Sequence, residues 1–187
     1  MLKKREQQQL ELSRQWVEKV VVGMNLCPFA KPILIADSLS YALTQAEELA
    51  DLETFFLEQL MHITASVEAK IATTLVIFPK ALANFYQYLD FVARCEELVE
   101  QAGLAEQFQL ASFHPNYVFA GVQAEDLSHW TNRSPFPMLH IIREAQMSRV
   151  LANHPNPQSI PERNIEFLRE LGKEELVKRF PPFKNYT

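Results

Sequence analysis

The chain has 187 residues, of which 48% are hydrophobic and 22% are charged, a composition typical of a globular protein with a buried core. Its net charge of −5 disfavours a general nucleic-acid-binding surface. Its apolar runs are far shorter than the roughly 20 residues that span a bilayer, which disfavours a membrane protein. We expect residues 1–187 to form one domain, with 153–187 as a C-terminal helical tail packed on the main body.

The N-terminal segment and the cysteine content bear on the cellular compartment. The opening residues MLKKREQQQLEL are basic but are not followed by an apolar stretch, so they do not resemble a signal peptide. Cys27 and Cys95 could form one disulfide at most. A cytoplasmic protein with free thiols is therefore the expectation.

The first expected elements are a helix, a strand and a second helix. Apolar residues recur on one helical face over 16–24, and either Gly23 or Asn25 could end that helix. Apolar and small polar residues alternate over 39–43, which predicts a half-buried strand. A second helical stripe occupies 49–63.

The middle of the chain continues this alternation. Residues 71–78, IATTLVIF, are β-branched and almost wholly apolar, which predicts a central strand ended by Pro79. A helix is expected over 85–103, followed by a strand over 107–113. The order of elements favours an α/β fold, with a small, mainly parallel sheet and helices packed on it.

The last third of the chain predicts helices. Ser134 and Pro135 have the residue types of a helix start, so a helix is expected near 136–152. The proline-rich segment 153–161 then connects to the helical tail. The alternative is an α+β sandwich in which a further strand at 117–120 pairs antiparallel.

The end of the strand over 107–113 presents a group of polar side chains. Ligands of open α/β sheets gather at the carboxyl ends of the strands, and His114, Asn116 and Tyr117 leave this strand together. His114 could serve as a general base, a general acid or a metal ligand. The alternative is that it only satisfies a loop carbonyl. We take Asn116 and Tyr117 as candidates for substrate binding.

Cys27 is the main chemical candidate, because it follows the first helix and precedes Pro28. The carboxyl end of that helix would raise the pKa of the thiol. If Pro28 opens a new helical turn, Cys27 becomes its N-cap and the thiolate is favoured. A small buried apolar residue is the third interpretation. Cys95 lies on the apolar side of its helix and is expected in the core.

A third polar segment covers 129–144. Arg133 beside a helix start would bind a carboxylate or phosphate, and we take Asn132, Arg133 and Arg143 as candidate substrate-binding residues. His140 and Glu144 would share a helix face and could hold a metal. The alternative is a structural network.

Several motifs together resemble a known family. NLCPFAK, TTLVIFP, ASFHPNYVFAG, TNRSPFPMLHIIRE and IPERNI look like the bacterial and plant family called domain of unknown function 1415. The resemblance extends from Trp16 to Ile165. It implies that these polar segments are hallmarks of the family, and it implies no activity, because none is established for that family.

Two functional hypotheses follow. The first is a small cytosolic enzyme in which Cys27 is the nucleophile or redox thiol, His114 is its base, and Arg133 with Asn132 binds a small anionic substrate. In a metal variant, Cys27, His114 and His140 are three metal ligands. The second is a non-enzymatic binding or scaffold protein that holds a ligand, a metal or haem through Cys27.

Cofactors and partners are less well defined. The four glycines are scattered, so no phosphate-binding loop supports a nucleotide cofactor. The aromatic tail FPPFKNYT could dock on the body of the protein or on a second copy as a homodimer.

Overall fold

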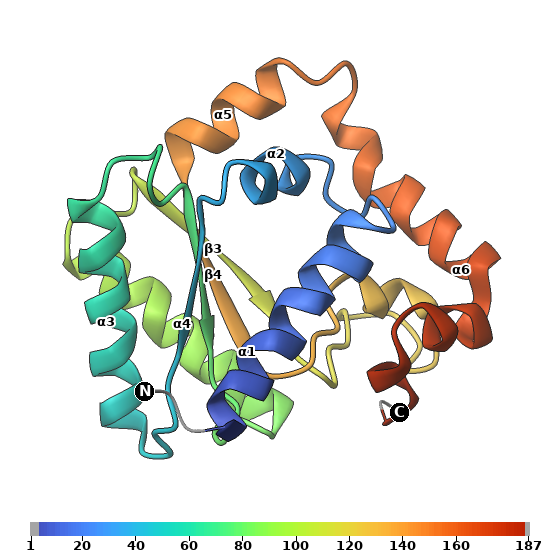
Figure 1. Cartoon of the computed structure of the whole chain (residues 1–187), viewed down its shortest axis with the longest axis horizontal. Coiled ribbons are helices and arrows are strands. Elements are labelled where there is room, and N and C mark those ends of the chain that lie inside the picture. The colour runs from blue at the N-terminus through green and yellow to red at the C-terminus, as the bar shows by residue number, and fades with distance from the viewer. Residues whose placement is uncertain (1–3, 186–187) are drawn as a thin grey trace.

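The computed structural model describes residues 4–185 as a four-stranded sheet with helices on both faces (Figure 1). The strand order is β1-β2-β4-β3. The strands are β1 (Leu39–Leu43), β2 (Thr73–Ile77), β3 (Phe108–Phe113) and β4 (Met138–Arg143). The longer helices are α1 (Lys4–Trp16), α3 (Leu49–Ala65), α4 (Phe85–Gln101), α5 (Glu144–Ala152) and α6 (Ile160–Arg179), and α2 (Ala30–Ile35) is short.

The sheet is mixed, which corrects the expectation of a mainly parallel one. The predictions of strands over 39–43, 71–78 and 107–113 are confirmed, and β1 pairs parallel to β2. β4 lies between β2 and β3 and is antiparallel to both. Two of the three strand pairs are therefore antiparallel, although β1, β2 and β3 run in the same direction.

β4 also corrects the helix predicted near 136–152. The first half of that segment forms the strand, and only α5 is helical. Ser134 does not cap a helix, because its hydroxyl donates to the carbonyl of Phe136 at 2.6 Å. A short apolar run such as MLHII does not distinguish a buried strand from a helix by its periodicity. The antiparallel strand of the alternative fold was expected at 117–120, but those residues lie in a loop.

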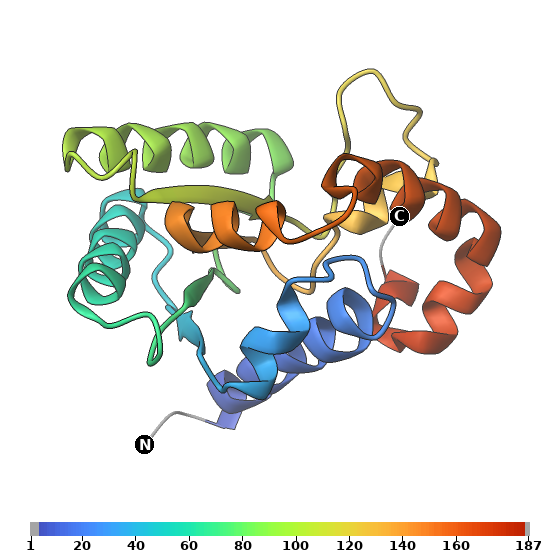
Figure 2. The same cartoon turned by 90° about the horizontal axis from the view of Figure 1, so that it is seen from above.

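Two apolar clusters cover the two faces of the sheet. α3 and α4 pack on one face, where Val76, Leu139 and Ile141 are buried. The N-terminal helix and α6 contribute to the cluster on the other face, which includes Leu75 and Met138. Figure 2 shows α4 on the opposite side of the sheet from α1 and α2. Within residues 4–185, no helix is both long and apolar enough to cross a membrane.

The N-terminal helix changes its winding before it ends. After α1, residues Val17–Val22 form a π-helix (η1), a rare conformation that is often found near functional sites. Gly23 follows it, and a Cβ atom at this position would lie 2.4 Å from the carbonyl oxygen of Lys19. Asn25 then takes a left-handed conformation with a φ of 53°. These two residues turn the chain toward Cys27.

The C-terminal helix α6 is kinked at Gly172, where φ is 75°. The aromatic segment after α6 folds back onto the chain, because Phe180 and Phe183 are buried and the Phe183 ring contacts Trp130 at 4.6 Å between centroids. The last two residues of this segment lie outside the described residues.

Candidate functional site

A cavity of about 210 Å³ lies between the sheet and the helices α1, η1, α2 and α5. Side chains from all four strands form its floor: Leu39, Thr73, Leu75, Ala111, Phe113, His140 and Ile142. Helices and the turn before α2 form its roof: Trp16, Val17, Val21, Cys27, Phe29, Ala30, Ile33, Gln146, Met147 and Val150. Most of these side chains are apolar. The Trp16 indole N–H donates to the carbonyl of Arg133, and four other side chains carry polar groups.

Two of the polar groups lie on the floor. Leu75 of β2 pairs with His140 of β4, so Thr73 and His140 occupy diagonal positions on the same face. Such diagonal neighbours lie roughly 7 Å apart. The Thr73 hydroxyl and the His140 Nε2 are both buried, and neither has a hydrogen-bond partner within the described part of the chain. The floor of an apolar cavity thus carries two unsatisfied polar atoms.

Burial also sets the charge state of His140. Removal of the ring from solvent lowers its pKa from 6.5 to about 4, because the imidazolium form loses its hydration. His140 is therefore neutral near pH 7. A neutral imidazole can donate or accept at Nε2, depending on its tautomer.

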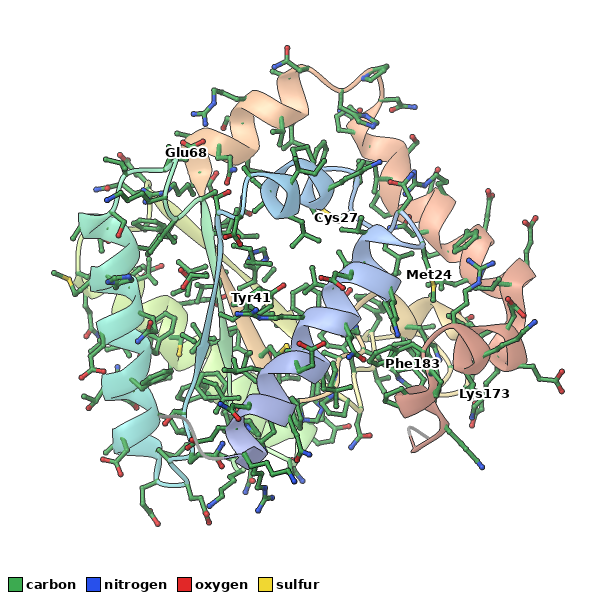
Figure 3. All side chains as sticks on the ribbon, viewed as in Figure 1. Met24, Cys27, Tyr41, Glu68, Lys173 and Phe183 are labelled. Atoms are coloured by element: carbon green, nitrogen blue, oxygen red, sulfur yellow. The ribbon has the colours of Figure 1, made fainter. Side chains whose placement is uncertain are left out.

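The roof contributes the Cys27 thiol. Figure 3 shows Cys27 between the end of the N-terminal helix and α2. The backbone N–H groups of Phe29 and Ala30 hydrogen-bond the sulfur and lower its pKa, but burial is the larger effect and the pKa of the thiol is raised overall. The backbone N–H groups act as the N-cap interpretation expected, but the raised pKa comes from burial and not from the carboxyl end of the preceding helix. The thiol is mainly protonated at neutral pH.

Helix α6 holds the turn that carries Cys27. The amide nitrogen Nδ2 of Asn164 donates to the carbonyl of Leu26 at 2.7 Å, and Arg163 donates to the carbonyl of Asn25. Asn164 is buried. The segment IPERNI therefore positions the cysteine turn, although 138 residues separate Asn164 from Leu26.

Gln146 adds an amide to the roof. It lies in the first turn of α5, directly after β4, and only 9% of its surface is exposed. Among residues 4–185, no hydrogen bond of its side chain is found. Neither Thr73 nor Gln146 is marked as a site residue by any local sequence pattern. A threonine pair within the apolar strand 71–78 was the only available signal for Thr73.

The structure does not bring His114 to Cys27. His114 is fully buried and packs against Phe85 and Tyr88, which belong to the apolar cluster on the α3–α4 side of the sheet. Its Nδ1 accepts from the backbone N–H of Asn116 at 3.0 Å, and its Nε2 lies 2.9 Å from the carbonyl of Leu82. Both ring nitrogens thus bond to the backbone, as the loop-capping alternative expected.

Other polar residues predicted to bind a substrate contact β3 or nearby loops instead. Asn132 donates to the carbonyl of Ser112 at 3.1 Å, and Tyr117 places its hydroxyl 3.4 Å from the Ser112 hydroxyl. Arg133 is only 4% exposed, stacks over the Trp130 ring and lies 3.4 Å from the carbonyl of Tyr117. Asn116 is exposed.

Arg143 lies at the far end of β4 and caps another element. Its guanidinium donates to the carbonyls of Ile63 and Ser66 at 2.6 and 2.7 Å, at the C-terminus of α3. It also donates to Ile71 at 3.2 Å. None of the residues Asn116, Tyr117, Asn132, Arg133 and Arg143 lines the cavity. Their proposed contact with a substrate stays a prediction.

The three ligands of the metal hypothesis do not gather. Cys27 and His140 line the cavity, whereas His114 lies in the apolar cluster on the other face. Across residues 4–185, no group of three or more His, Cys, Asp or Glu side chains could hold a metal ion. Cys95 is buried in the α3–α4 cluster, as expected.

A second hollow, of about 370 Å³, is lined by residues that include Glu47, Glu53, Asp90 and Arg94. Glu47 pairs with Lys80 and Glu53 pairs with Arg94, each at 3.4 Å. Glu47, Glu53 and Arg94 therefore have ionic partners, and Asp90 is exposed, so the hollow has the character of a charged surface rather than of an apolar cavity.

Comparison with known proteins places the chain in a family. No curated protein and no solved structure matches the chain. A family model described as "Protein of unknown function (DUF1415)" matches residues 8–178, which include Cys27, Thr73, His140, Gln146 and Asn164. The family suggested by the sequence motifs is therefore confirmed, and the chain belongs to the domain of unknown function 1415 family.

Proposed function

We propose that this protein binds a small, uncharged and largely apolar molecule in the cavity beneath η1, α2 and α5. The observation that carries the proposal is the pair of unsatisfied polar atoms on the cavity floor, the Thr73 hydroxyl and the His140 Nε2. Native proteins leave few buried polar atoms without a partner. A ligand with one polar group between these two residues would satisfy both.

The energetic reason is the cost of an unsatisfied group. Burial of a polar atom without a partner costs about 1–3 kcal/mol. A bound ligand that bonds both atoms removes this cost and also covers the apolar walls, which adds a hydrophobic contribution. Apolar pockets with a few convergent polar groups are the usual form of small-molecule sites.

The volume limits the size of the ligand. An engineered protein cavity of about 150 Å³ binds benzene, so by proportion a cavity of this size holds roughly eight or nine non-hydrogen atoms. Haem has several times as many atoms, so this volume favours a much smaller ligand. The ligand is accordingly a small organic molecule.

The lining indicates the charge of the ligand. The cavity is lined by no Lys, Arg, Asp or Glu among residues 4–185, and a charged ligand would lose its hydration without gaining an ionic partner. The anionic substrate expected from Arg133 would have to bind elsewhere. Pairing of Cys27 with His114 would require the histidine to release two backbone hydrogen bonds.

Thermal denaturation with two isosteric compounds tests the proposal. Benzamide is neutral and has a polar group on an apolar ring, whereas benzoate has the same shape and a negative charge. We expect benzamide to raise the Tm and benzoate to have no effect, because ligand binding to the folded state stabilises it. In the Ala111→Leu variant, where the larger side chain fills the floor, benzamide should lose its effect. Stabilisation by benzoate alone would contradict the proposal.

A further inference from the structure

We propose that the cavity captures short-chain α,β-unsaturated carbonyl compounds, with Cys27 adding to the double bond while Thr73 and His140 hold the carbonyl oxygen. This inference rests on the proposed function and adds a reaction and a substrate class to it. It uses Cys27, whose thiol is the only one that lines the cavity within the described residues.

The arrangement of the polar groups favours this class. Cys27 belongs to the roof, and Thr73 and His140 belong to the floor, so the nucleophile and the oxygen-binding groups come from opposite walls. In an α,β-unsaturated carbonyl compound, the carbon that a thiol attacks is separated from the oxygen by two further carbon atoms. A direct attack on a carbonyl carbon would instead require the oxygen-binding groups to lie beside the sulfur.

The floor can stabilise the charge that develops during the addition. Electron density moves to the carbonyl oxygen as the sulfur attacks, and a threonine hydroxyl and a neutral imidazole N–H are both suitable donors. Neither atom has a competing partner among the described residues. Hydrogen bonds of this kind are stronger in an apolar cavity than in water.

The reaction balances without any other reactant. The Cys27 sulfur forms a bond to the β-carbon, the carbon–carbon π bond opens, and the thiol proton ends on the α-carbon. No group leaves, and nothing is oxidised or reduced. An addition of this kind is compatible with a cavity whose walls are mostly apolar, because the reaction does not require an activated water molecule.

Intact-protein mass spectrometry with 3-octen-2-one tests the inference, and saturated 2-octanone is the matched control compound. We expect an adduct equal in mass to one whole molecule of the enone, located on Cys27 by peptide mapping and absent from Cys27→Ser. Thr73→Val should slow adduct formation at least tenfold, whereas Thr74→Val should not change it. Thr74 provides the control because its hydroxyl is equally unsatisfied but lies on the other face of the sheet.

The outcomes separate this inference from the proposed function. If 2-octanone raises the Tm and the enone forms no adduct on Cys27, the cavity binds ligands and the addition chemistry is wrong. If neither compound has an effect, both proposals fail. An adduct that forms equally fast in Thr73→Val would also overturn the inference, because it would reflect ordinary thiol reactivity.

Discussion

Replacement of Thr73 by valine should stabilise the folded protein and weaken the binding of benzamide in the cavity. Valine has nearly the shape of threonine but lacks the hydroxyl, which is buried without a partner among the described residues, in a side chain that is only 5% exposed. Relief of that burial is worth about 1–3 kcal/mol, and we expect the free energy of unfolding to rise by about 1 kcal/mol. For a chain of this length the Tm should then rise by roughly 2–4 °C.

Thr74→Val is the matched control for this prediction. Its hydroxyl is also unsatisfied and its side chain is 1% exposed, but it faces α3 and α4 rather than the cavity. Urea denaturation should show stabilisation in both variants, and calorimetric titration with benzamide should show weaker binding only in Thr73→Val. A loss of stability in Thr73→Val would refute the reasoning, because it would mean that the hydroxyl contributes to the fold rather than to a ligand.

Three further predictions concern the surroundings of the cavity. Asn164→Ala removes the hydrogen bond to the Leu26 carbonyl, so amide hydrogen exchange should accelerate at residues 26–30; unchanged exchange there would contradict the positioning role of α6. The pKa of His140 is lowered to about 4 in the folded protein, so the unfolded chain binds the extra proton between about pH 6.5 and 4 and stability falls as the pH falls through this range. The free energy of unfolding should fall by about 3 kcal/mol at most. Urea denaturation at pH 7 and pH 4.5 should show a smaller fall in His140→Leu than in the wild-type protein. The same fall in both proteins would exclude His140 as its cause. Gly23→Ala places a methyl group against the Lys19 carbonyl and should lower the Tm by several degrees. An unchanged Tm would show that the backbone of η1 can shift to accept the methyl group without a loss of stability.

Local patterns in the sequence predicted most of the elements. The strands over 39–43, 71–78 and 107–113 have clear alternation or a bounded apolar run, and the helices between them have regular stripes. β4 was missed because MLHII is short and apolar except for His140, so its periodicity does not separate a strand from a helix. The mixed sheet follows from that one strand, since its insertion between β2 and β3 depends on contacts that are distant in sequence.

The candidate site was predicted only in part for a similar reason. Cys27 and His140 were identified by their chemistry, and both line the cavity. Thr73 gains its significance from β4, which places His140 diagonally across from it, and no local pattern contains that information. His114 had the chemistry of a catalytic base, but its loop directs both nitrogens to backbone groups. Residue type therefore identified candidates, and the long-range pairing decided which of them share a cavity.

The most direct test of the ligand-binding cavity is a titration of the ¹⁵N-labelled protein with benzamide, followed by two-dimensional NMR. We expect chemical-shift changes that saturate and that cluster at Cys27, Thr73, Ala111 and Gln146, which come from the roof and the floor of one cavity. Absence of saturable changes at these residues, or changes confined to the hollow around Glu47 and Asp90, would contradict the account.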